Sequence, residues 1–423
     1  MINTQLSQIT DMNRVYLSAS VAVIPLAVLW AVQRSRRMEI AKVPSKTVVI
    51  IGGSWAGINV AHGLLKQVPN VKVVMINPSE DYYFNVASPR IIARPEVFAR
   101  EKYMFPLAEL FAKYPKGGIE IIIGKATSIN TEGKKVSVRE NTSEPSRDIA
   151  YDYLVIASGS TTKATLGLDS VKVPFKPSVN GSTDAEIKNA QETLKAANSI
   201  IIGGAGAVGV ELAAEIAQER PNVEVTLITP TDKVLPGLKD GPRNKAGKVL
   251  KSLGINLVTG NSVQSAHQDP SSGKWTVTLS NNKTLTADSY VTAAGVVPNN
   301  DFIPNTLLNE NGWVEVDQYF HASKIQSSAS IYAVGDITQN PMRVVSRMTV
   351  QAAAVVSNLK ADILGKGKRV SFDFDKQGVM MGVPLGRSDG TGQIGSFVIP
   401  GFVMAFMKGR DYMTGMGRKM LSG

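Results

Sequence analysis

The residues of this sequence whose types and spacing could do chemistry are glycines that follow apolar runs. The clearest set is Gly204, Gly206 and Gly209, which matches the pattern G-x-G-x-x-G after the apolar stretch 199–203. Glycines at these positions let the chain turn tightly and let its backbone approach a pyrophosphate. The start of the following helix favours negative charge, because its first N–H groups are free. The pattern therefore predicts a site for the pyrophosphate of a dinucleotide.

An earlier turn has a similar pattern with one departure. Gly52 and Gly57 hold the outer positions after the β-branched run 47–51, and Ser54 replaces the middle glycine. Serine is small, so a close approach of the backbone to a phosphate remains possible. Two such turns in one chain suggest two different dinucleotides. The simplest chemistry for that pair is hydride transfer from a nicotinamide to a flavin.

The acidic residue expected at the end of the second strand of each unit is missing. Asn77 and Thr229 stand there, where an aspartate or glutamate would bind the adenosine ribose and disfavour a 2′-phosphate. Asn77 can still form a hydrogen bond to a ribose. Thr229, with Lys233 nearby, leaves the choice between NADH and NADPH open.

Composition excludes several other kinds of chemistry. The chain has no cysteine, which excludes a redox-active disulfide, a thiolate nucleophile and a cysteine-held iron–sulfur cluster. With three histidines, His62, His267 and His321, no metal site is expected. The formal net charge is +11, which suits an anionic membrane surface or an anionic cofactor. The basic residues are scattered and form no basic helix with interleaved aromatics, so nucleic acid is not an expected partner.

The elements that must position these turns repeat as a set. Each turn lies between a buried strand and a helix, and a second strand follows, which is a βαβ unit. Alternating stretches that predict a small antiparallel sheet follow both units, so a whole domain plan is repeated. The expected segments are strands 47–51, 71–77, 199–203 and 223–229, and helices 58–67 and 207–220.

The first 45 residues differ from the rest. Residues 15–33 are nineteen residues without a charge, and as a helix they would span roughly 28 Å, close to the thickness of a bilayer core. Arg34, Arg36 and Arg37 follow at once, which predicts that the rest of the chain stays in the cytosol. A secretory signal would carry its positive charge before the apolar run, and a mitochondrial presequence would be amphipathic and rich in arginine. We therefore expect an uncleaved membrane anchor, with a helix of a soluble protein as the alternative.

Five segments in order carry a family resemblance. "GGSWAG", "YLVIASGS", "GAGAVGVELAAE", "VTAAGVVPN" and "SIYAVGDIT" together resemble the two-dinucleotide-binding-domain flavoproteins, the pyridine nucleotide–disulfide reductase fold, over roughly residues 47–360. The resemblance implies an α/β fold with two Rossmann-like dinucleotide-binding domains, one for FAD and one for NAD(P)H. The expected parts are an N-terminal apolar helix and linker (1–45), an FAD-binding domain (46–165 and 290–345), an NAD(P)H-binding domain (166–289) and a short C-terminal α+β region on the interface or quinone side (346–423).

The same resemblance implies which residues contact the cofactors. In this family the first turn binds FAD, the second binds NAD(P)H, and the aspartate of a G-D pair binds the FAD ribitol. Ser158 stands where the family's A-T-G segment has threonine, a mild departure. The expected cofactor contacts are Gly52, Gly53, Ser54, Ala56, Gly57, Asn77, Arg90, Ala126, Ser158, Gly159, Gly204, Gly206, Gly209, Glu211, Gly295, Pro298, Gly335 and Asp336.

Two further segments narrow the resemblance. "GVPLGRSDGTGQIGSF" (382–397) and "FNVASPR" (84–90) are similar to segments of the ferroptosis suppressor protein and other apoptosis-inducing-factor-like NAD(P)H:quinone oxidoreductases. "TVQAAA" (349–354) partly resembles the quinone-site pattern of type II NADH dehydrogenases. The subfamily's lipid modification at an N-terminal glycine has no match, since Ile2 follows Met1.

This resemblance implies hydride transfer from NAD(P)H to FAD and electron transfer from the flavin to a quinone or another small acceptor. The expected catalytic residues are Glu211, which would orient the nicotinamide, Arg90, which would stabilise anionic reduced flavin, and Gln351, which would face the flavin pyrimidine or the quinone.

Several alternatives stay open at this stage. The chain could be an NADH- and FAD-binding sensor or cell-death signalling protein with slow oxidase activity, or a type II NADH dehydrogenase. A monooxygenase or a ferredoxin reductase of the same fold would share both turns. The apolar, Met-rich tail 397–413 could dock on a membrane, or could face the core or the partner in a homodimer. The expected location is the cytosolic face of the mitochondrial outer membrane, with the endoplasmic reticulum or a lipid droplet as alternatives.

Overall fold

The computed structural model describes residues 45–423 except 142–144, 180, 323–329, 341–342, 375 and 377. The predicted anchor helix at 15–33 lies outside the described residues. Within the described part of the chain, no helix has both the length and the apolar character needed to cross a bilayer.

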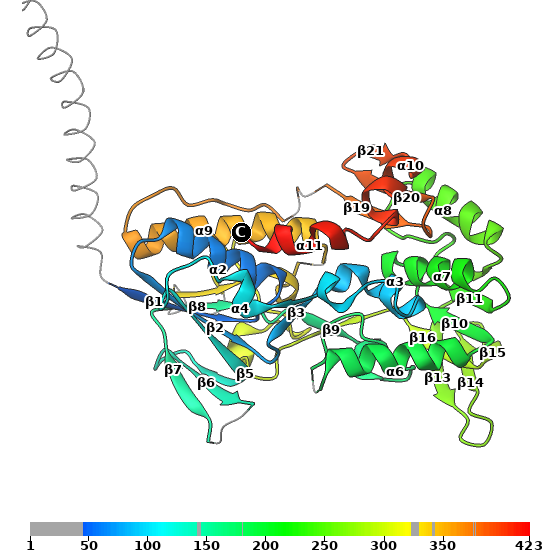
Figure 1. Ribbon diagram of the computed structural model, residues 1–423, viewed down its shortest axis with the longest axis horizontal. Coiled ribbons are helices and arrows are strands. Elements are labelled where there is room, and N and C mark those ends of the chain that lie inside the picture. Colours follow the sequence, from blue (N-terminus) through cyan, green and yellow to red (C-terminus); the bar gives the residue numbers. More distant parts are fainter. Residues whose placement is uncertain are drawn as a thin grey trace, which may run out of the picture.

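The first Rossmann-like unit is built on a seven-stranded sheet (Figure 1). Its strands lie in the order β18 (Ile331–Ala333), β8 (Tyr153–Ile156), β1 (Lys46–Ile51), β2 (Val71–Asn77), β5 (Ile119–Asn130), β6 (Lys135–Glu140) and β7 (Arg147–Ala150). The strands from β18 to β5 run parallel, and β6 and β7 continue the sheet as an antiparallel extension. Helix α2 (Trp55–Gln67) packs on β1 and β2, and α9 (Val345–Leu364) packs on α2. Val48, Val49 and Ile50 of β1 are fully buried, as expected of a parallel strand covered on both faces.

The second unit repeats this plan on a four-stranded parallel sheet. Its strands lie in the order β12 (Asn256–Val258), β11 (Glu224–Ile228), β10 (Ser199–Gly203) and β16 (Ser289–Thr292). Figure 1 shows α7 (Ala207–Glu219) and α6 (Thr183–Ala196) on opposite sides of this sheet. Helix α8 (Asp240–Ser252) precedes β12, and β13 (Val263–Gln268), β14 (Trp275–Leu279) and β15 (Thr284–Ala287) form a small antiparallel sheet.

A two-stranded ribbon and a group of short elements connect the two units. The ribbon pairs β9 (Ser160–Thr162) with β17 (Val296–Pro298) in antiparallel register. Helix α3 (Ser88–Ala93), which belongs to the first unit by sequence, contacts both α6 and α7 of the second. The remaining short elements are β3 (Asp81–Tyr83), η1 (Asn85–Ala87), η2 (Arg100–Lys102), β4 (Met104–Pro106), α4 (Leu107–Leu110), α5 (Lys163–Leu166), η3 (Asn305–Leu307) and η5 (Gly335–Ile337).

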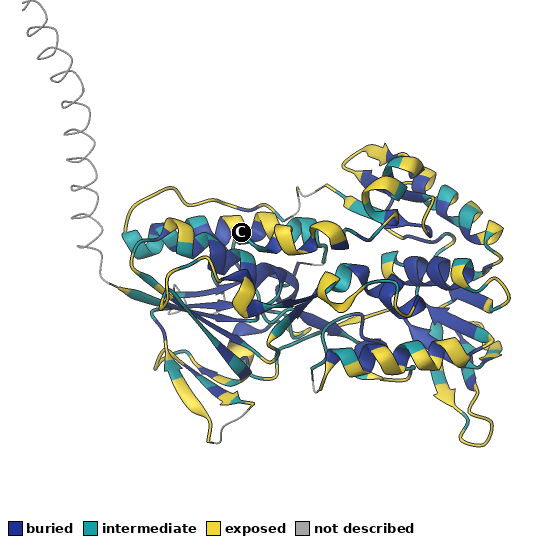
Figure 2. Ribbon diagram, viewed as in Figure 1, coloured by how far each residue is buried: buried dark blue, intermediate teal, exposed yellow. Residues whose placement is uncertain are grey.

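The C-terminal segment extends from the second unit to the first. It begins with an antiparallel sheet of β19 (Met380–Pro384), β20 (Gly390–Ile394) and β21 (Phe397–Ile399), followed by α10 (Gly401–Met404), the π-helical turn η6 (Ala405–Gly409) and α11 (Thr414–Leu421). Strand β20 contacts α8 of the second unit, and α11 contacts α2 of the first. Figure 2 shows much of this segment's outer surface as exposed.

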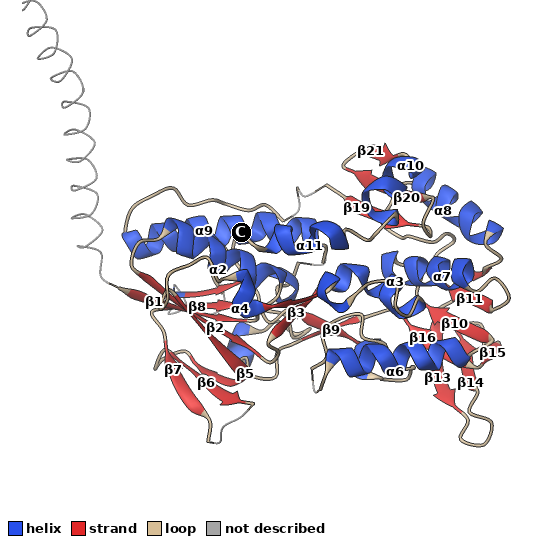
Figure 3. Cartoon of the chain, viewed as in Figure 1, coloured by secondary structure: helices blue, strands red, loops and turns tan. Residues whose placement is uncertain are grey.

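The structure confirms the α/β fold with two Rossmann-like sheets, and Figure 3 shows the two sheets with their helices. Both predicted antiparallel additions are present, as β5–β7 and as β13–β15. The boundaries of the FAD and NAD(P)H domains stay a prediction.

Candidate functional site

The first turn requires glycine at two positions, 52 and 57. Gly52 has a φ of +115°, and a Cβ atom there would lie 2.2 Å from the carbonyl oxygen of Ala157. A Cβ on Gly57 would lie 1.9 Å from the carbonyl oxygen of Gly52. The turn therefore presses the start of α2 against the end of β1, and the free N–H groups at the start of α2 are available to an anion.

Neighbouring side chains brace this first turn. The Asn77 side-chain oxygen accepts a hydrogen bond from the Gly53 N–H at 2.8 Å, and its amide group donates to the Ser79 carbonyl at 2.7 Å. Trp55 donates from its indole N–H to the Thr349 hydroxyl of α9 at 2.9 Å. The expected contact between Asn77 and a ribose stays a prediction, and the structure adds a role for Asn77 in holding the turn.

Asp336 lies in a buried position next to the first turn. Its Oδ2 accepts hydrogen bonds from the Ser160 hydroxyl at 3.0 Å and from the Lys176 ammonium group at 2.7 Å. Its Oδ1 is also buried, and no described residue donates a hydrogen bond to it. A buried carboxylate oxygen without a donor suits a hydroxyl group of a bound molecule, because an unmade hydrogen bond there is costly.

Other predicted residues lie around Asp336. The Gln351 side-chain oxygen accepts a hydrogen bond from the Gly335 N–H at 3.2 Å. This bond fixes α9 to η5, the turn that contains Gly335 and Asp336 and is called the G-D turn below. A Cβ on Gly335 would lie 3.0 Å from the Ala56 side chain, which places the G-D turn against the start of α2. Ser54 is the residue before α2 and makes no side-chain capping hydrogen bond there.

Two predicted cofactor-contact segments, which contain Ser158 and Pro298, lie side by side at the ribbon of β9 and β17. The Ser158 hydroxyl donates to the Asn299 carbonyl at 2.8 Å, and the Asn299 amide donates back to the Ser158 carbonyl at 2.8 Å. The Gly159 carbonyl accepts from the Asn299 N–H at 3.1 Å. Pro298 pairs with Ser160, the residue that also holds Asp336. Gly295 lies just before β17 with a φ of +81°. Ala126, another predicted contact, lies on β5 opposite Val138.

The second turn repeats the backbone of the first. Gly204 has a φ of +121°, and a Cβ on Gly209 would lie 1.9 Å from the carbonyl oxygen of Gly204. Around Gly206 the described residues leave open space, because a Cβ there would meet no atom within 4 Å. Thr229 is buried, with its hydroxyl 3.0 Å from that of Thr231. Lys233 forms an ion pair with Asp240 at 2.7 Å.

Glu211, predicted to orient the nicotinamide, is buried on α7 and forms an ion pair with the C-terminal segment. Its carboxylate lies 2.6 Å from the ammonium group of Lys408 in η6. Burial raises the pKa of Glu211 above its ordinary value, and the charge of Lys408 opposes that shift.

Arg90, predicted to stabilise reduced flavin, lies in a buried ion cluster. Its guanidinium group donates two hydrogen bonds to Glu215, at 2.9 and 2.7 Å, and one to the Arg410 carbonyl at 2.9 Å. It also stacks on the Tyr412 ring, and Arg94 adds a second cation to Glu215 at 2.8 Å. The structure thus shows Arg90 joining α3, α7 and the C-terminal segment, while its expected effect on the flavin stays a prediction.

Sequence reasoning missed Glu215, Lys408 and Lys176. A sign of Glu215 was available, because it follows Glu211 by four residues in an otherwise apolar stretch of helix. Lys408 and Lys176 have no local signal, since their partners lie 197 and 160 residues away.

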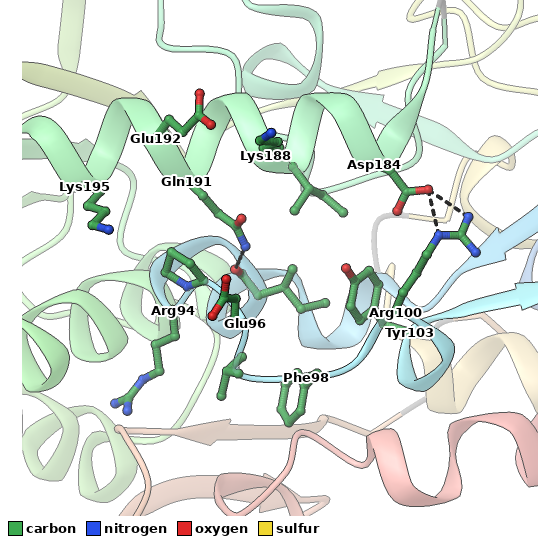
Figure 4. Close-up of a pocket in the computed structure, with 14 residues that line it drawn as sticks. Arg94, Glu96, Phe98, Arg100, Tyr103, Asp184, Lys188, Gln191, Glu192 and Lys195 are labelled. Carbon is green, nitrogen blue, oxygen red and sulfur yellow. Dashed lines mark hydrogen bonds and ion pairs between the residues drawn. The ribbon is translucent and has the colours of Figure 1, made fainter.

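A separate cavity of about 560 Å³ lies between α6 and the loop that follows α3 (Figure 4). Phe98 and Tyr103 line one side, and Gln191 of α6 donates to the Ile91 carbonyl at 2.7 Å. Arg100 bridges Asp184 and Asp81. In the part of the chain that the structure describes, no predicted cofactor contact lines this cavity.

Comparison with known proteins identifies the family. The family model for pyridine nucleotide-disulphide oxidoreductases matches residues 46–354. This chain belongs to the pyridine nucleotide-disulphide oxidoreductase family. Oxidoreductase ptaL of Pestalotiopsis fici is 34% identical over 371 residues, covering 85% of this chain and 94% of that protein. Ferroptosis suppressor protein 1 of Xenopus tropicalis is 25% identical, covering 87% of this chain and 93% of that protein.

Two solved structures have a similar fold. The sulfide:quinone oxidoreductase of Aquifex aeolicus superimposes with a TM-score of 0.72 at 20% identity, covering 89% of this chain and 92% of that one. NDH2 of Plasmodium falciparum superimposes with a TM-score of 0.69 at 14% identity, covering 90% of this chain and 98% of that one. The predicted resemblance is therefore confirmed.

Members of this family use FAD and NAD(P)H, which are the cofactors of this chain. The residues present fit an FAD molecule, because the first turn leaves free helix N–H groups and Asp336 has a buried oxygen to which no described residue donates.

Proposed function

We propose that the protein is an NAD(P)H:quinone oxidoreductase that works at a membrane surface. The observation that carries this proposal is the position of exposed apolar side chains on the C-terminal segment. Phe402 and Phe406 expose 76% and 74% of their surface, and Phe397 and Met407 are also exposed. Lys408 follows this apolar run directly and reaches inward to Glu211. A hydrophobic acceptor and its membrane would thus contact the protein close to Glu211, the residue predicted to orient the nicotinamide.

In this proposal the two turns hold different dinucleotides. The turn from Gly52 to Gly57 binds the pyrophosphate of FAD, and Asp336 accepts a hydrogen bond from the FAD ribitol through Oδ1. The turn from Gly204 to Gly209 binds the pyrophosphate of NAD(P)H. When bound, the flavin supplies the chemistry of accepting a hydride and passing on two electrons.

The chain's own residues supply position and charge. Lys408 neutralises Glu211, so that this buried carboxylate stays in place beside the second turn as a group that orients the nicotinamide. Gln351 fixes the G-D turn from α9. The pair of Arg90 and Glu215 holds α3 against α7 and so sets the first unit against the second.

The mitochondrial outer membrane, the endoplasmic reticulum and a lipid droplet stay predictions, as does a homodimer. Ferroptosis suppressor protein 1 and apoptosis-inducing factor homologues are among the relatives, so a redox-sensing or signalling role is the second candidate function.

Stopped-flow absorbance tests the proposal. The purified protein is mixed with NADH or NADPH without oxygen, and a short-chain ubiquinone is then added. We expect the visible flavin band to bleach and then to recover quickly with the quinone, and the two nicotinamides can be ranked by rate. Bleaching without quinone-driven recovery would favour the sensor. Absence of flavin absorbance, even after reconstitution with FAD, would overturn the assignment of the first turn.

A double substitution tests the membrane part of the proposal. Phe402→Ser together with Phe406→Ser removes exposed apolar surface and leaves Lys408 in place. We expect this variant to reduce a short-chain quinone in solution like the unchanged protein, and to reduce a long-chain quinone held in anionic vesicles more slowly, because the segment no longer docks on the bilayer. Equal rates with the vesicle-bound quinone would contradict the docking role of the segment.

A further inference from the structure

Backbone hydrogen bonds fix the loop that carries Lys176 beside Asp336. Lys176 lies in the loop between α5 and α6, where its N–H donates to the Thr165 hydroxyl at 3.2 Å. The preceding residue, Phe175, is buried, and its carbonyl accepts from the Asn85 amide group at 3.2 Å. The loop is therefore fixed on both sides, and the Lys176 side chain extends to the Asp336 carboxylate.

The two oxygens of Asp336 have different partners. Oδ2 receives Lys176 and Ser160, whereas Oδ1 is buried and receives no donor from the described residues. Asp336 is 4% exposed and Lys176 is 22% exposed, so the pair is shielded from water mainly on the carboxylate side. Arg343 donates to the backbone carbonyl of Asp336 at 3.3 Å, so it contacts the backbone of this residue and Lys176 contacts its carboxylate.

We propose that Lys176 is a positioning residue of the FAD site, acting through Asp336. A buried carboxylate is costly unless a cation compensates it, and the ion pair also fixes the carboxylate orientation before a ligand arrives. By occupying Oδ2, Lys176 leaves Oδ1 as the acceptor for a hydroxyl group of the flavin side chain. This inference rests on the proposed binding of FAD at the first turn.

Lys176 belongs by sequence to the part of the chain predicted to bind NAD(P)H. Lys176 lies inside the predicted NAD(P)H-binding segment 166–289, a few residues before α6. A residue that leads into the second unit therefore completes the site of the first.

Titration of the apoprotein with FAD, followed by flavin fluorescence, tests the inference. We expect Lys176→Met to weaken FAD binding about tenfold, the loss typical of a hydrogen bond to a charged group. Lys176→Arg should restore most of that affinity, because arginine keeps the charge and the donors. Lys172→Met is the matched control, since Lys172 lies in the same loop and pairs with Glu186 instead.

A double-mutant cycle separates positioning from a direct or purely structural role. If Lys176 acts through Asp336, adding Lys176→Met to Asp336→Asn should change the FAD affinity less than about twofold. An undiminished tenfold loss in the Asp336→Asn background would overturn the proposal, as would unchanged affinity in Lys176→Met alone. Failure of the unchanged apoprotein to bind FAD would instead reject the proposed function, so the two failures are distinguishable.

Discussion

The two glycine turns have almost the same backbone and different surroundings. Gly52 and Gly204 have φ angles of +115° and +121°. A Cβ added to Gly57 would lie 1.9 Å from the Gly52 carbonyl oxygen, and one added to Gly209 would lie 1.9 Å from the Gly204 carbonyl oxygen. Around the first turn, Asn77 and Leu107 pack on Gly53, and the G-D turn of Asp336 lies beside α2. At equivalent positions, Trp55 and Ala56 of the first turn are buried, whereas Ala207 is half-buried and Val208 is exposed in the second. A Cβ on Gly206 of the second turn would also meet no described atom within 4 Å.

This difference is what one expects of one cofactor that stays bound and another that exchanges in each turnover. The first turn is closed and held by hydrogen bonds, and Asp336 Oδ1 lies beside it as an acceptor. Such a turn is preorganised for tight binding, because its residues lose little further conformational freedom when the ligand binds. An open turn binds more weakly and releases its ligand faster. The comparison therefore supports FAD at the first turn and NAD(P)H at the second.

Replacing the last glycine of either turn should have the largest effect, because it should abolish binding of the dinucleotide at that turn alone. Gly57→Val places a side chain where even a Cβ lies 1.9 Å from a carbonyl oxygen, so the turn cannot form and FAD binding should be lost. Gly209→Val meets the same clash in the second turn, so it should keep FAD and lose NAD(P)H binding. Flavin absorbance after purification measures the first effect, and bleaching by NADH or NADPH measures the second.

The same pair of variants can contradict the assignment of the turns. If Gly209→Val loses its flavin and Gly57→Val keeps it, the two dinucleotides occupy the turns in the opposite order. Loss of folding in either variant would show in the far-ultraviolet circular dichroism spectrum. The milder Gly57→Ala and Gly209→Ala variants, which meet the same carbonyl with one carbon atom, would then serve in their place.

The contrast between local and distant features explains how much the sequence could predict. Both turns and their βαβ units follow from short patterns, because strand, glycine turn and helix are consecutive in the chain. The open space at Gly206 and the bracing at Gly53 depend on side chains from other elements, which no spacing rule locates. The pairs Arg90–Glu215 and Glu211–Lys408 join residues 125 and 197 positions apart, so only the folded chain shows them.

Removing Lys408 should act on the second turn and spare the first. Lys408→Met leaves Glu211 buried without its cation, so the carboxylate should lose its charge or its position. We expect flavin reduction by NAD(P)H to slow about 10- to 100-fold, equivalent to a few kcal/mol, with FAD content unchanged. Stopped-flow bleaching measures the rate. Lys419→Met, on an exposed position of α11, is the control, and an equal slowing there would argue against a specific role of the ion pair.

The same ion pair makes a prediction about pH. Burial raises the pKa of Glu211 in the folded protein, and without Lys408 it should rise further. A carboxylate whose pKa is raised on folding costs stability once the pH exceeds its unfolded value, because ionisation then favours the unfolded chain. The stability gap between Lys408→Met and the unchanged protein should therefore widen from about pH 5 to about pH 8. Urea unfolding at both pH values measures the gap, and a constant gap would reject the account.

Removing the brace at the first turn should have a moderate effect. Asn77→Ala leaves the Gly53 N–H without its 2.8 Å acceptor, so the turn becomes less ordered before FAD binds. We expect FAD affinity to fall about tenfold. Thr229→Ala is the matched change at the second turn. Within the described part of the chain its hydroxyl contacts Thr231 and no residue of the turn, so FAD affinity should stay unchanged. Equal losses of FAD affinity in both variants would remove the distinction between a braced and an unbraced turn.

The smallest change tests the open space itself. Gly206 has φ and ψ angles of −73° and −174°, which alanine adopts readily, and its added Cβ would meet no described atom within 4 Å. Gly206→Ala should therefore leave the free energy of unfolding within about 0.5 kcal/mol of its original value. Because the methyl group would stand where a pyrophosphate approaches the backbone, the KM for NAD(P)H should rise a few-fold while FAD affinity stays the same. If FAD affinity falls and the KM for NAD(P)H does not, the open turn is the flavin site, and the difference between the turns must be explained by something other than ligand exchange.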